Sequence, residues 1–132
     1  YYIAIVEGHL ANDTGEIDFP LIVDYPNRPK QKVCFETGKK SLTKYQVLER
    51  FSYKGHKVTR VKLTPITGRS HQLRVHMQQS GHPILGDRLY APEPVIALTD
   101  RLQLHAEQLS IDHPVNGQRL TFYSQNTFNF DN

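Results

Sequence analysis

The pattern of apolar and polar positions predicts a chain built mainly of β-strands. Residues 57–64 alternate strictly, with Thr59, Val61 and Leu63 on one side of the predicted strand and the intervening residues on the other. A long stretch rich in leucine, tyrosine, valine and phenylalanine, 41–51, precedes it, and a Lys-Gly-His turn separates the two. We therefore expect these two segments to form a β-hairpin.

Other segments combine β-branched and aromatic residues in short runs that end at turn residues, which is typical of strands. They are residues 1–6, 16–23, 32–35, 102–111 and 119–123. Pro20 lies inside the second of these segments, so we expect an edge strand or a bend there, because proline cannot donate a ladder hydrogen bond. Residues 92–98 fit either a short helix or a loop.

One segment changes to the helical period. Leu73, His76 and Met77 fall on one helix face, and Gly81 stands where such a helix would end. Ser70 is the expected N-cap, because a serine side chain accepts a hydrogen bond from the free N–H groups of the first turn. The sum of these elements is an α+β fold with a mixed, mainly antiparallel β-sheet and few helices.

The composition is that of an ordinary folded domain. The chain has 132 residues, of which 38% are hydrophobic and 22% charged, so it is long enough for one domain or part of one. No apolar run approaches the roughly 20 residues that a membrane-spanning helix needs, and we expect no signal peptide, because these residues do not show its pattern. Cys34 is the only cysteine, which excludes an internal disulfide and fits a reducing, cytoplasmic setting.

Positive charge is concentrated in one segment. Residues 28–40 carry five basic side chains and one acidic one, which gives +4, against a net charge of +3 for the whole chain. The basic residues are Arg28, Lys30, Lys32, Lys39 and Lys40. Such a cluster is either a solvated loop or a contact surface for an acidic partner such as RNA, and charge alone does not separate the two.

The first residues are unusual for a free N-terminus. The chain opens with the apolar run YYIAIV and has no initiator methionine, since Met77 is its only methionine. Exposed polar ends are more usual. We therefore expect a fragment that is cut close to or inside a strand, with an open strand edge at 1–6 through which copies of it self-associate.

The histidines of residues 67–90 do not have the spacing of a metal site. His71 and His76 are five residues apart and His82 follows six later, with no His-Glu-x-x-His or paired cysteine pattern, so no metal is expected. A serine nucleophile is equally unsupported, because the G-x-S-x-G turn is missing. We expect His76, His82 and His105 to form structural hydrogen bonds instead.

An anion site is the most specific local signal. Gly68, Arg69 and Ser70 lie just before the predicted helix, where free backbone N–H groups and the helix dipole favour a negative charge. The Arg69 guanidinium can hold a carboxylate or a phosphate with two hydrogen bonds. Arg74 lies one turn into the helix, and we expect it to satisfy a structural carboxylate such as Asp87.

Three motifs in the second half of the chain resemble the C-terminal motif set of the RluA-type pseudouridine synthases in order and spacing. They are GRSHQLRVHM, GHPILGDRLYA and LQLHAEQLSIDHP. The opening YYIAIVEG is similar to the strand that carries the active-site tyrosine of that family, and PLIVDYPNRPKQKVCFETGK resembles its RluA subgroup. The resemblance implies that residues 1–132 are the C-terminal part of a single catalytic domain. The family's catalytic aspartate lies in a His-Arg-Leu-Asp motif, which does not occur in these residues.

The resemblance also implies a reaction. The family isomerises uridine in RNA to pseudouridine without a cofactor, and the RluA subgroup acts on large-subunit rRNA of the 23S type and on the anticodon stem-loop of tRNA. The target base must leave its stack before it can react. We expect the intact protein to be such an isomerase in the cytoplasm, and the 132 residues alone to be inactive, because the aspartate is missing.

By this resemblance, two residues act in catalysis. Tyr2 stacks on the flipped uracil and serves in removing the C5 proton, and Arg69 pairs with the catalytic aspartate. Leu104 lines the uracil pocket, although a plain core leucine on an alternating strand is the alternative. His71 and Gln72 order the site or touch the RNA backbone.

RNA phosphates are the expected partners of Arg28, Lys30 and Lys32, because folded RNA is held largely through its backbone. Two other functions stay open. One is a non-catalytic RNA-binding module that uses the basic segment 28–40. The other is a protein that binds a phosphate ligand at residues 68–70.

Overall fold

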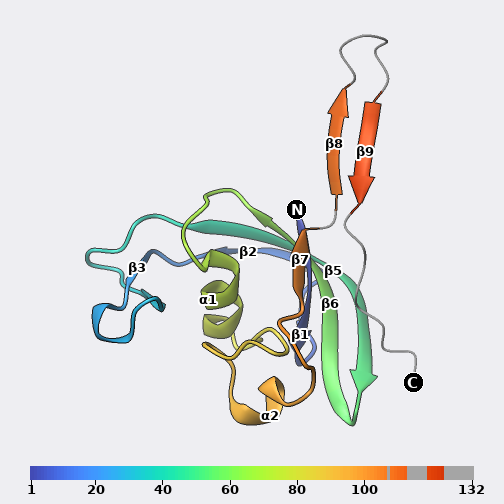
Figure 1. Cartoon of the computed structure of the whole chain (residues 1–132), viewed down its shortest axis with the longest axis horizontal. Helices are drawn as coiled ribbons and strands as arrows, with labels where there is room; N and C mark the ends of the chain where they lie inside the picture. The colour runs from blue at the N-terminus through green and yellow to red at the C-terminus, as the bar shows by residue number, and fades with distance from the viewer. Residues whose placement is uncertain (107, 113–118, 124–132) are drawn as a thin grey trace.

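A five-stranded antiparallel sheet forms the centre of the computed structural model, which describes residues 1–106, 108–112 and 119–123 (Figure 1). Its strand order is β2-β5-β6-β1-β7. The strands are β1 (Tyr2–Glu7), β2 (Thr14–Asp18), β5 (Leu42–Tyr53), β6 (His56–Pro65) and β7 (Leu104–Ala106). Two further antiparallel pairs are β3 (Leu21–Val23) with β4 (Gln31–Val33) and β8 (Gln108–Asp112) with β9 (Arg119–Tyr123). The predicted α+β fold with a mainly antiparallel sheet is confirmed.

The longest pairing is the hairpin of β5 and β6, as the alternating pattern predicts. Its register ends with Tyr53 opposite His56. Lys54 and Gly55 form the turn with φ angles of 50° and 80°, which is the backbone that a tight two-residue hairpin turn requires. At its other end, β6 leads into the loop before helix α1. Because Leu63 of β6 pairs with Tyr2 of β1, this loop lies near the N-terminal end of β1.

Both faces of the sheet are covered, and each cover forms a separate apolar core. On one face, helix α1 (Gln72–Gln79) packs Leu73 and Met77 against the strands. The other face is covered by the segment that contains helix α2 (Glu93–Ile96). The first core contains Ala4, Val6, Leu10, Ile17, Val61, Leu63, Leu73, Met77 and Ile84, and the second contains Ile3, Ile5, Val58, Leu85, Val95 and Leu98. Coverage of both faces explains why β1 is a continuous apolar run instead of an alternating one.

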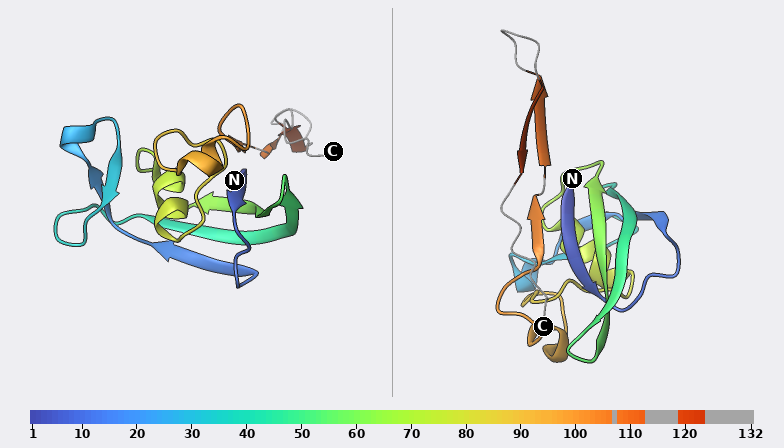
Figure 2. Two further views of the ribbon diagram at one scale, coloured as in Figure 1. Left: turned by 90° about the horizontal axis from the view of Figure 1, so that it is seen from below. Right: turned by 90° about the vertical axis from the view of Figure 1, so that its right-hand side faces the viewer.

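Strands β3 and β4 and the 3-10 helix η1 (Tyr25–Asn27) between them form an arm, residues 20–39, that carries most of the basic segment. The arm projects beyond the end of the sheet, beside α1 (Figures 1 and 2). Pro20 separates β2 from β3, so the bend predicted at this proline is confirmed. The strand predicted at 32–35 is observed at Gln31–Val33.

Helix α1 begins without the serine cap predicted at Ser70. Its N-cap position is His71, which has a left-handed backbone with φ 55°, and no side-chain hydrogen bond caps the helix there. The buried Gln72 side chain holds this turn instead, because its Oε1 accepts hydrogen bonds from the Arg69 N–H (3.0 Å) and the Thr67 hydroxyl (2.6 Å). The assignment of Ser70 as the N-cap is therefore wrong, since a long-range hydrogen-bond network overrides the local preference.

The open edge expected at residues 1–6 is also wrong. Strand β1 is hydrogen-bonded to β6 on one side, where Tyr2 lies opposite Leu63, and to β7 on the other, where Tyr2 lies opposite Ala106. The structure therefore gives no support to self-association through this strand. Residues 102–111, predicted as one strand, contain β7 and the start of β8. Within the described part of the chain, no helix is both long and apolar enough to cross a bilayer.

Candidate functional site

A pocket of about 240 Å³ opens where β1, β6 and β7 meet the loop before α1. Pockets for drug-sized ligands hold roughly 300–1,000 Å³, so this one suits a single small group. It is lined by Tyr2, Pro65, Thr67, Gly68, Arg69, His71, Gln72, Leu73, Arg74 and Leu104. The sequence assigned Tyr2 and Arg69 to catalysis, Leu104 to the uracil pocket, and His71 and Gln72 to ordering the site or contacting the RNA backbone. All five residues lie around this one pocket.

Tyr2 and Leu104 form the apolar wall of the pocket. Tyr2 lies opposite Ala106, and Ala4 lies opposite Leu104, so the side chains of Tyr2 and Leu104 are diagonal neighbours on one face of the sheet. Both are partly buried and pack against the first core. Leu104 is therefore a core residue and a pocket residue at once, and the two alternatives for this leucine do not exclude each other.

Gln72 shapes the polar side of the pocket from within. Its side chain is almost fully buried, and its Nε2 donates hydrogen bonds to the Leu42 carbonyl and the Thr43 hydroxyl, both at 2.9 Å. With the two bonds that Oε1 accepts, every donor and acceptor of the amide is used. This geometry fits an ordering role for Gln72 and leaves no amide atom for the RNA backbone.

Arg69 reaches the pocket from the loop. Its side chain is exposed, and its Nε donates a hydrogen bond to the Lys40 carbonyl at 3.1 Å. None of the ion pairs among the described residues involves Arg69. A guanidinium held through Nε presents its two terminal nitrogens to a planar anion. The geometry therefore suits a carboxylate or a phosphate bound in two places.

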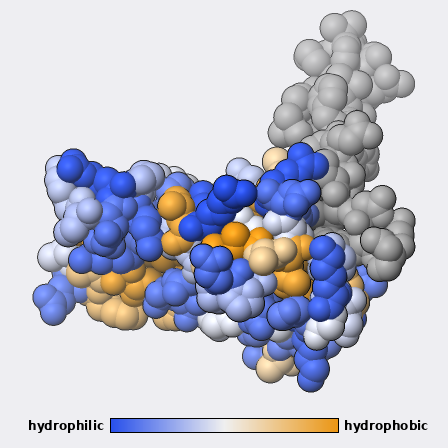
Figure 3. All heavy atoms as spheres, turned by 60° about the horizontal axis from the view of Figure 1, so that its bottom comes forward, coloured by the Kyte–Doolittle hydropathy of each residue, from blue (hydrophilic) through white to orange (hydrophobic). Residues whose placement is uncertain are grey.

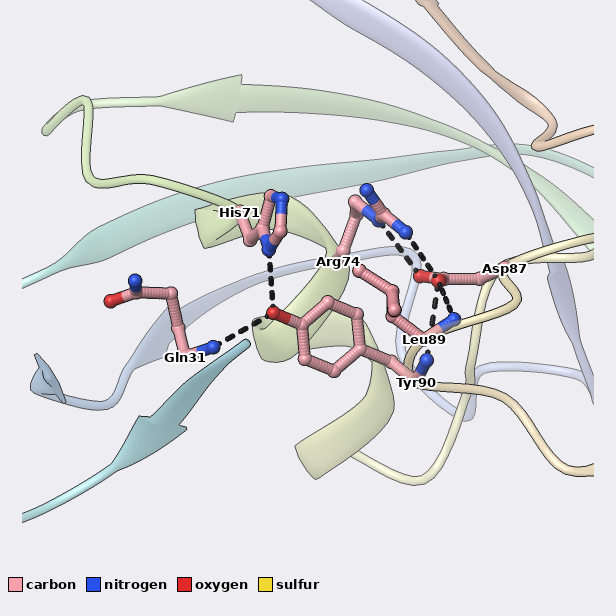
Figure 4. A network of polar contacts seen from close by, with 6 residues as sticks. All are labelled: Gln31, His71, Arg74, Asp87, Leu89 and Tyr90. Carbon is pink, nitrogen blue, oxygen red and sulfur yellow. Dashed lines mark hydrogen bonds and ion pairs between the residues drawn. The ribbon is translucent and has the colours of Figure 1, made fainter. Parts of the chain in front are cut away.

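Arg74 also lines the pocket, but it is paired within the chain, as predicted (Figure 4). Its Nε and Nη2 donate to the two oxygens of Asp87 at 3.1 Å and 2.7 Å. Asp87 is fully buried, and its Oδ1 also accepts hydrogen bonds from the backbone N–H groups of Leu89 and Tyr90. This ion pair fixes the 86–91 turn against α1.

His71 lies on the pocket wall with its Nδ1 2.6 Å from the Tyr90 hydroxyl (Figure 4). Burial lowers the pKa of His71 and the Arg74 charge lowers it further, while the smaller effect of the Asp87 charge opposes them. Burial also raises the pKa of Tyr90. Both side chains are therefore neutral near pH 7.

Sequence reasoning missed Tyr90 and Thr67 as parts of the site. Tyr90 does not line the pocket, but its hydroxyl contacts His71, which does. The available signal was the Gly-Asp-x-x-Tyr portion of GHPILGDRLYA, in which Asp87 holds the backbone of Tyr90. Thr67, whose hydroxyl binds Gln72, had no signal, because its role depends on the loop conformation.

His76 and His82 form the structural hydrogen bonds that were predicted for them. His76 is fully buried between the Thr43 hydroxyl (2.9 Å from Nδ1) and the Phe19 carbonyl (2.8 Å from Nε2), and burial lowers its pKa. His82 Nδ1 lies 2.8 Å from the Glu7 carbonyl. No group of three His, Cys, Asp or Glu side chains suited to a metal ion occurs among the described residues.

The predicted RNA-contact residues lie on the arm, outside the pocket. Arg28 and Lys32 are exposed, and the Arg28 guanidinium stacks 4.4 Å from the centre of the Tyr25 ring. Lys30 and Lys32 line a second hollow of about 220 Å³ between β4 and α1, together with Asp24, Gln31, Val75, Gln78, Gln79, Leu89 and Tyr90. Figure 3 shows hydrophilic residues gathered at the arm end of the molecule beside an apolar area.

Comparison with known proteins shows what this chain is similar to. The sequence model described as "RNA pseudouridylate synthase" matches residues 1–79. Proteins named "Dual-specificity RNA pseudouridine synthase RluA" are similar along nearly the whole chain. The one from Yersinia pestis is 60% identical over 127 residues, and the one from Pasteurella multocida is 56% identical over 128 residues. These alignments cover 96% and 97% of this chain but 60% and 57% of the relatives, so the chain spans little more than half their length.

Solved structures give the same result for the fold. Human RNA Pseudouridylate Synthase Domain Containing 1 superposes with a TM-score of 0.81 at 32% identity, over 96% of this chain and 54% of that one. Human RNA Pseudouridylate Synthase Domain Containing 4 superposes with a TM-score of 0.65 at 26% identity, over 94% of this chain and 56% of that one.

Proposed function

The chain belongs to the RNA pseudouridylate synthase family, and on that premise we propose that the protein containing it isomerises uridine in RNA to pseudouridine at the 240 Å³ pocket. The observation that carries this proposal is the gathering of Tyr2, Arg69 and Leu104 around one small cavity. These residues come from three separate parts of the sequence, and each supplies a different need of the reaction. Tyr2 and Leu104 offer flat and apolar surfaces to a base, and Arg69 offers a fixed charge.

The proposed reaction rearranges bonds within one nucleotide. The bond from C1′ of the ribose to N1 of uracil breaks, the base turns, and a bond from C1′ to C5 forms. The proton on C5 then leaves, and N1 takes up a proton from solvent. Atoms and electrons balance without an oxidant, a reductant or a cofactor. The target uridine leaves its stack and enters the pocket, where the Tyr2 ring lies against the base and its hydroxyl serves in removing the C5 proton.

The acid that starts the reaction is proposed to come from outside these residues. No His-Arg-Leu-Asp sequence occurs in the 132 residues, and the relatives are considerably longer than this chain. Arg69 would hold the incoming carboxylate with two hydrogen bonds and keep it ionised by its opposite charge. This role is supported by the exposed guanidinium at the rim of the pocket.

The proposed substrates are large-subunit rRNA and the anticodon stem-loop of tRNA, met in the cytoplasm. The relatives carry the name "Dual-specificity RNA pseudouridine synthase", which supports more than one RNA. The exposed Arg28 and Lys32, with Lys30 beside them, are suited to phosphate contacts on the arm. Contacts of this kind read the shape and backbone of a folded RNA.

The direct test is release of tritium from RNA that carries 5-tritiated uridine. We expect the full-length protein to release one tritium for each uridine converted, and the isolated 132 residues to release none. Absence of release by the full-length protein from both an rRNA fragment and a tRNA, with RNA still bound, would favour the non-catalytic RNA-binding module. Release by the isolated chain would show that the acid is not external.

Replacing Tyr2 with phenylalanine should separate binding from chemistry. The variant keeps the ring that faces the base but loses the hydroxyl, so we expect the single-turnover rate to fall about a hundredfold and RNA affinity to change little. Rate is measured by tritium release and affinity by filter binding. Tyr1→Phe is the matched control, because Tyr1 precedes Tyr2 directly but does not line the pocket. Equal rates for Tyr2→Phe and Tyr1→Phe would contradict the role of Tyr2.

Removing a charge from the arm should change the salt dependence of RNA binding. For Lys32→Ala we expect weaker binding to every RNA tested and a fall of about one in the slope of log Kd against log salt concentration, because one phosphate contact is lost. Lys44→Ala is the control, since Lys44 is an exposed lysine on β5 near Glu16 (3.9 Å) and outside the arm. An unchanged slope for Lys32→Ala would indicate that Lys32 contacts no phosphate, and it would favour the alternative in which the arm is a solvated loop.

A further inference from the structure

One oxygen atom connects the basic arm to the pocket. The Tyr90 hydroxyl accepts a hydrogen bond from the backbone N–H of Gln31 at 2.9 Å, and it lies 2.6 Å from Nδ1 of His71 (Figure 4). Gln31 is the first residue of β4, and His71 is the residue immediately before α1. Three segments that are far apart in the sequence therefore meet at this atom.

One arrangement of the hydrogen atoms satisfies all three groups at this junction without water. A backbone N–H can only donate, so Tyr90 is the acceptor from Gln31 and its own hydroxyl hydrogen remains to be placed. That hydrogen points to Nδ1 of His71, which is neutral and can accept it. His71 is then the tautomer with its hydrogen on Nε2, which points away from Tyr90 (Figure 4). Nε2 thus becomes a hydrogen-bond donor of fixed direction on a residue that lines the pocket.

The junction also separates two hollows. Tyr90 and Gln31 line the 220 Å³ hollow with Lys30 and Lys32, which are the residues on either side of Gln31. His71 lines the 240 Å³ pocket. A shift of β4 away from the body would break the bond to Tyr90 and remove one of the two contacts that position its hydroxyl.

Tyr90 is itself held firmly. Its backbone N–H donates to Oδ1 of the buried Asp87 at 3.2 Å, and the Arg74 guanidinium carbon lies 5.3 Å from the centre of its ring. The Lys30 ammonium lies 5.7 Å from the same ring centre. The Tyr90 side chain is therefore supported by Arg74 of the buried ion pair and by Lys30, which directly precedes β4.

We propose that Tyr90 is a positioning residue, which holds strand β4 and the His71 imidazole in one fixed arrangement so that RNA on the arm and uridine in the pocket are bound by a single rigid unit. This inference rests on the proposed function, because it needs a uridine in the pocket. It assigns no chemical step to Tyr90. It assigns to His71 the donation of an Nε2–H hydrogen bond to a polar atom of the bound nucleotide.

The test uses Tyr90→Phe in the full-length protein, because phenylalanine keeps the ring and removes only the shared oxygen. In ¹H–¹⁵N spectra we expect the Gln31 amide and both ring nitrogens of His71 to shift, with loss of the single-tautomer signature of His71. With RNA we expect kcat to fall about tenfold and KM to rise. The control is Tyr53→Phe, which removes a tyrosine hydroxyl beside the turn of the β5–β6 hairpin. It should change neither these spectra nor kcat and KM.

The outcomes separate the inference from the proposed function. If Tyr90→Phe lowers only the melting temperature and leaves kcat, KM and the His71 tautomer unchanged, Tyr90 is a structural residue and the inference is overturned while the function stands. If the unsubstituted full-length protein releases no tritium, the proposed function fails, and the spectra still decide whether the junction exists. Shifted spectra with unchanged kinetics would also overturn the positioning role.

Discussion

Replacing Arg69 with alanine is expected to lower kcat/KM of the full-length protein about a thousandfold. The guanidinium is proposed to hold the catalytic carboxylate in position and in its ionised form, so its loss affects each turnover directly. Affinity for RNA should fall much less, because the arm lysines and not Arg69 are expected to supply most phosphate contacts. Single-turnover tritium release and filter binding on the same preparation measure the two effects separately.

Two variants make the Arg69 result specific. Arg69→Lys keeps the charge but loses the planar two-point contact, so we expect an activity between those of alanine and arginine. Arg101→Ala removes an exposed arginine that does not line the pocket, and it should be neutral. If Arg69→Ala retained full activity, or if Arg69 pointed away from the acid in a structure of the intact enzyme, the proposed mechanism would be wrong.

Local patterns predicted the elements of this fold well where local forces decide. The alternation in 57–64 led to the β5–β6 hairpin, and Pro20 marked the bend between β2 and β3. The cap of α1 was missed because Ser70 has the better intrinsic preference, yet the buried Gln72 amide makes four hydrogen bonds that hold the turn one residue later. A network of this kind depends on the tertiary structure and leaves no local pattern.

The residues of the site were likewise predicted only in part. Tyr2, Arg69 and Leu104 were found through motif resemblance, and their proximity follows from a sheet in which β1 lies between β6 and β7. That order could not be read from the apolar run at the start of the chain, which instead suggested an open edge. Tyr90 was missed because its two hydroxyl contacts lie 19 and 59 residues away in the sequence.

The buried Asp87 should carry the largest single contribution to stability among the polar side chains of the site. Asp87→Ala leaves the Arg74 side chain, which is only 19% exposed, without its ion-pair partner, and it removes the acceptor for two backbone N–H groups. Breaking a buried ion pair from one side costs about 3–5 kcal/mol. We therefore expect the free energy of unfolding to fall by that amount, as measured by urea denaturation of the full-length protein.

A double-mutant cycle tests whether the Asp87 effect comes from the ion pair. Arg74→Ala together with Asp87→Ala should cost clearly less than the sum of the two single changes, because no unpaired charge remains buried. Asp100→Ala, which removes an exposed carboxylate, serves as the control and should be nearly neutral. Because Asp87 also holds the backbone of Tyr90, the ring nitrogens of His71 should shift in Asp87→Ala as they do in Tyr90→Phe. A loss below about 1 kcal/mol, or strictly additive changes, would mean that water replaces the carboxylate and that the turn needs no ion pair.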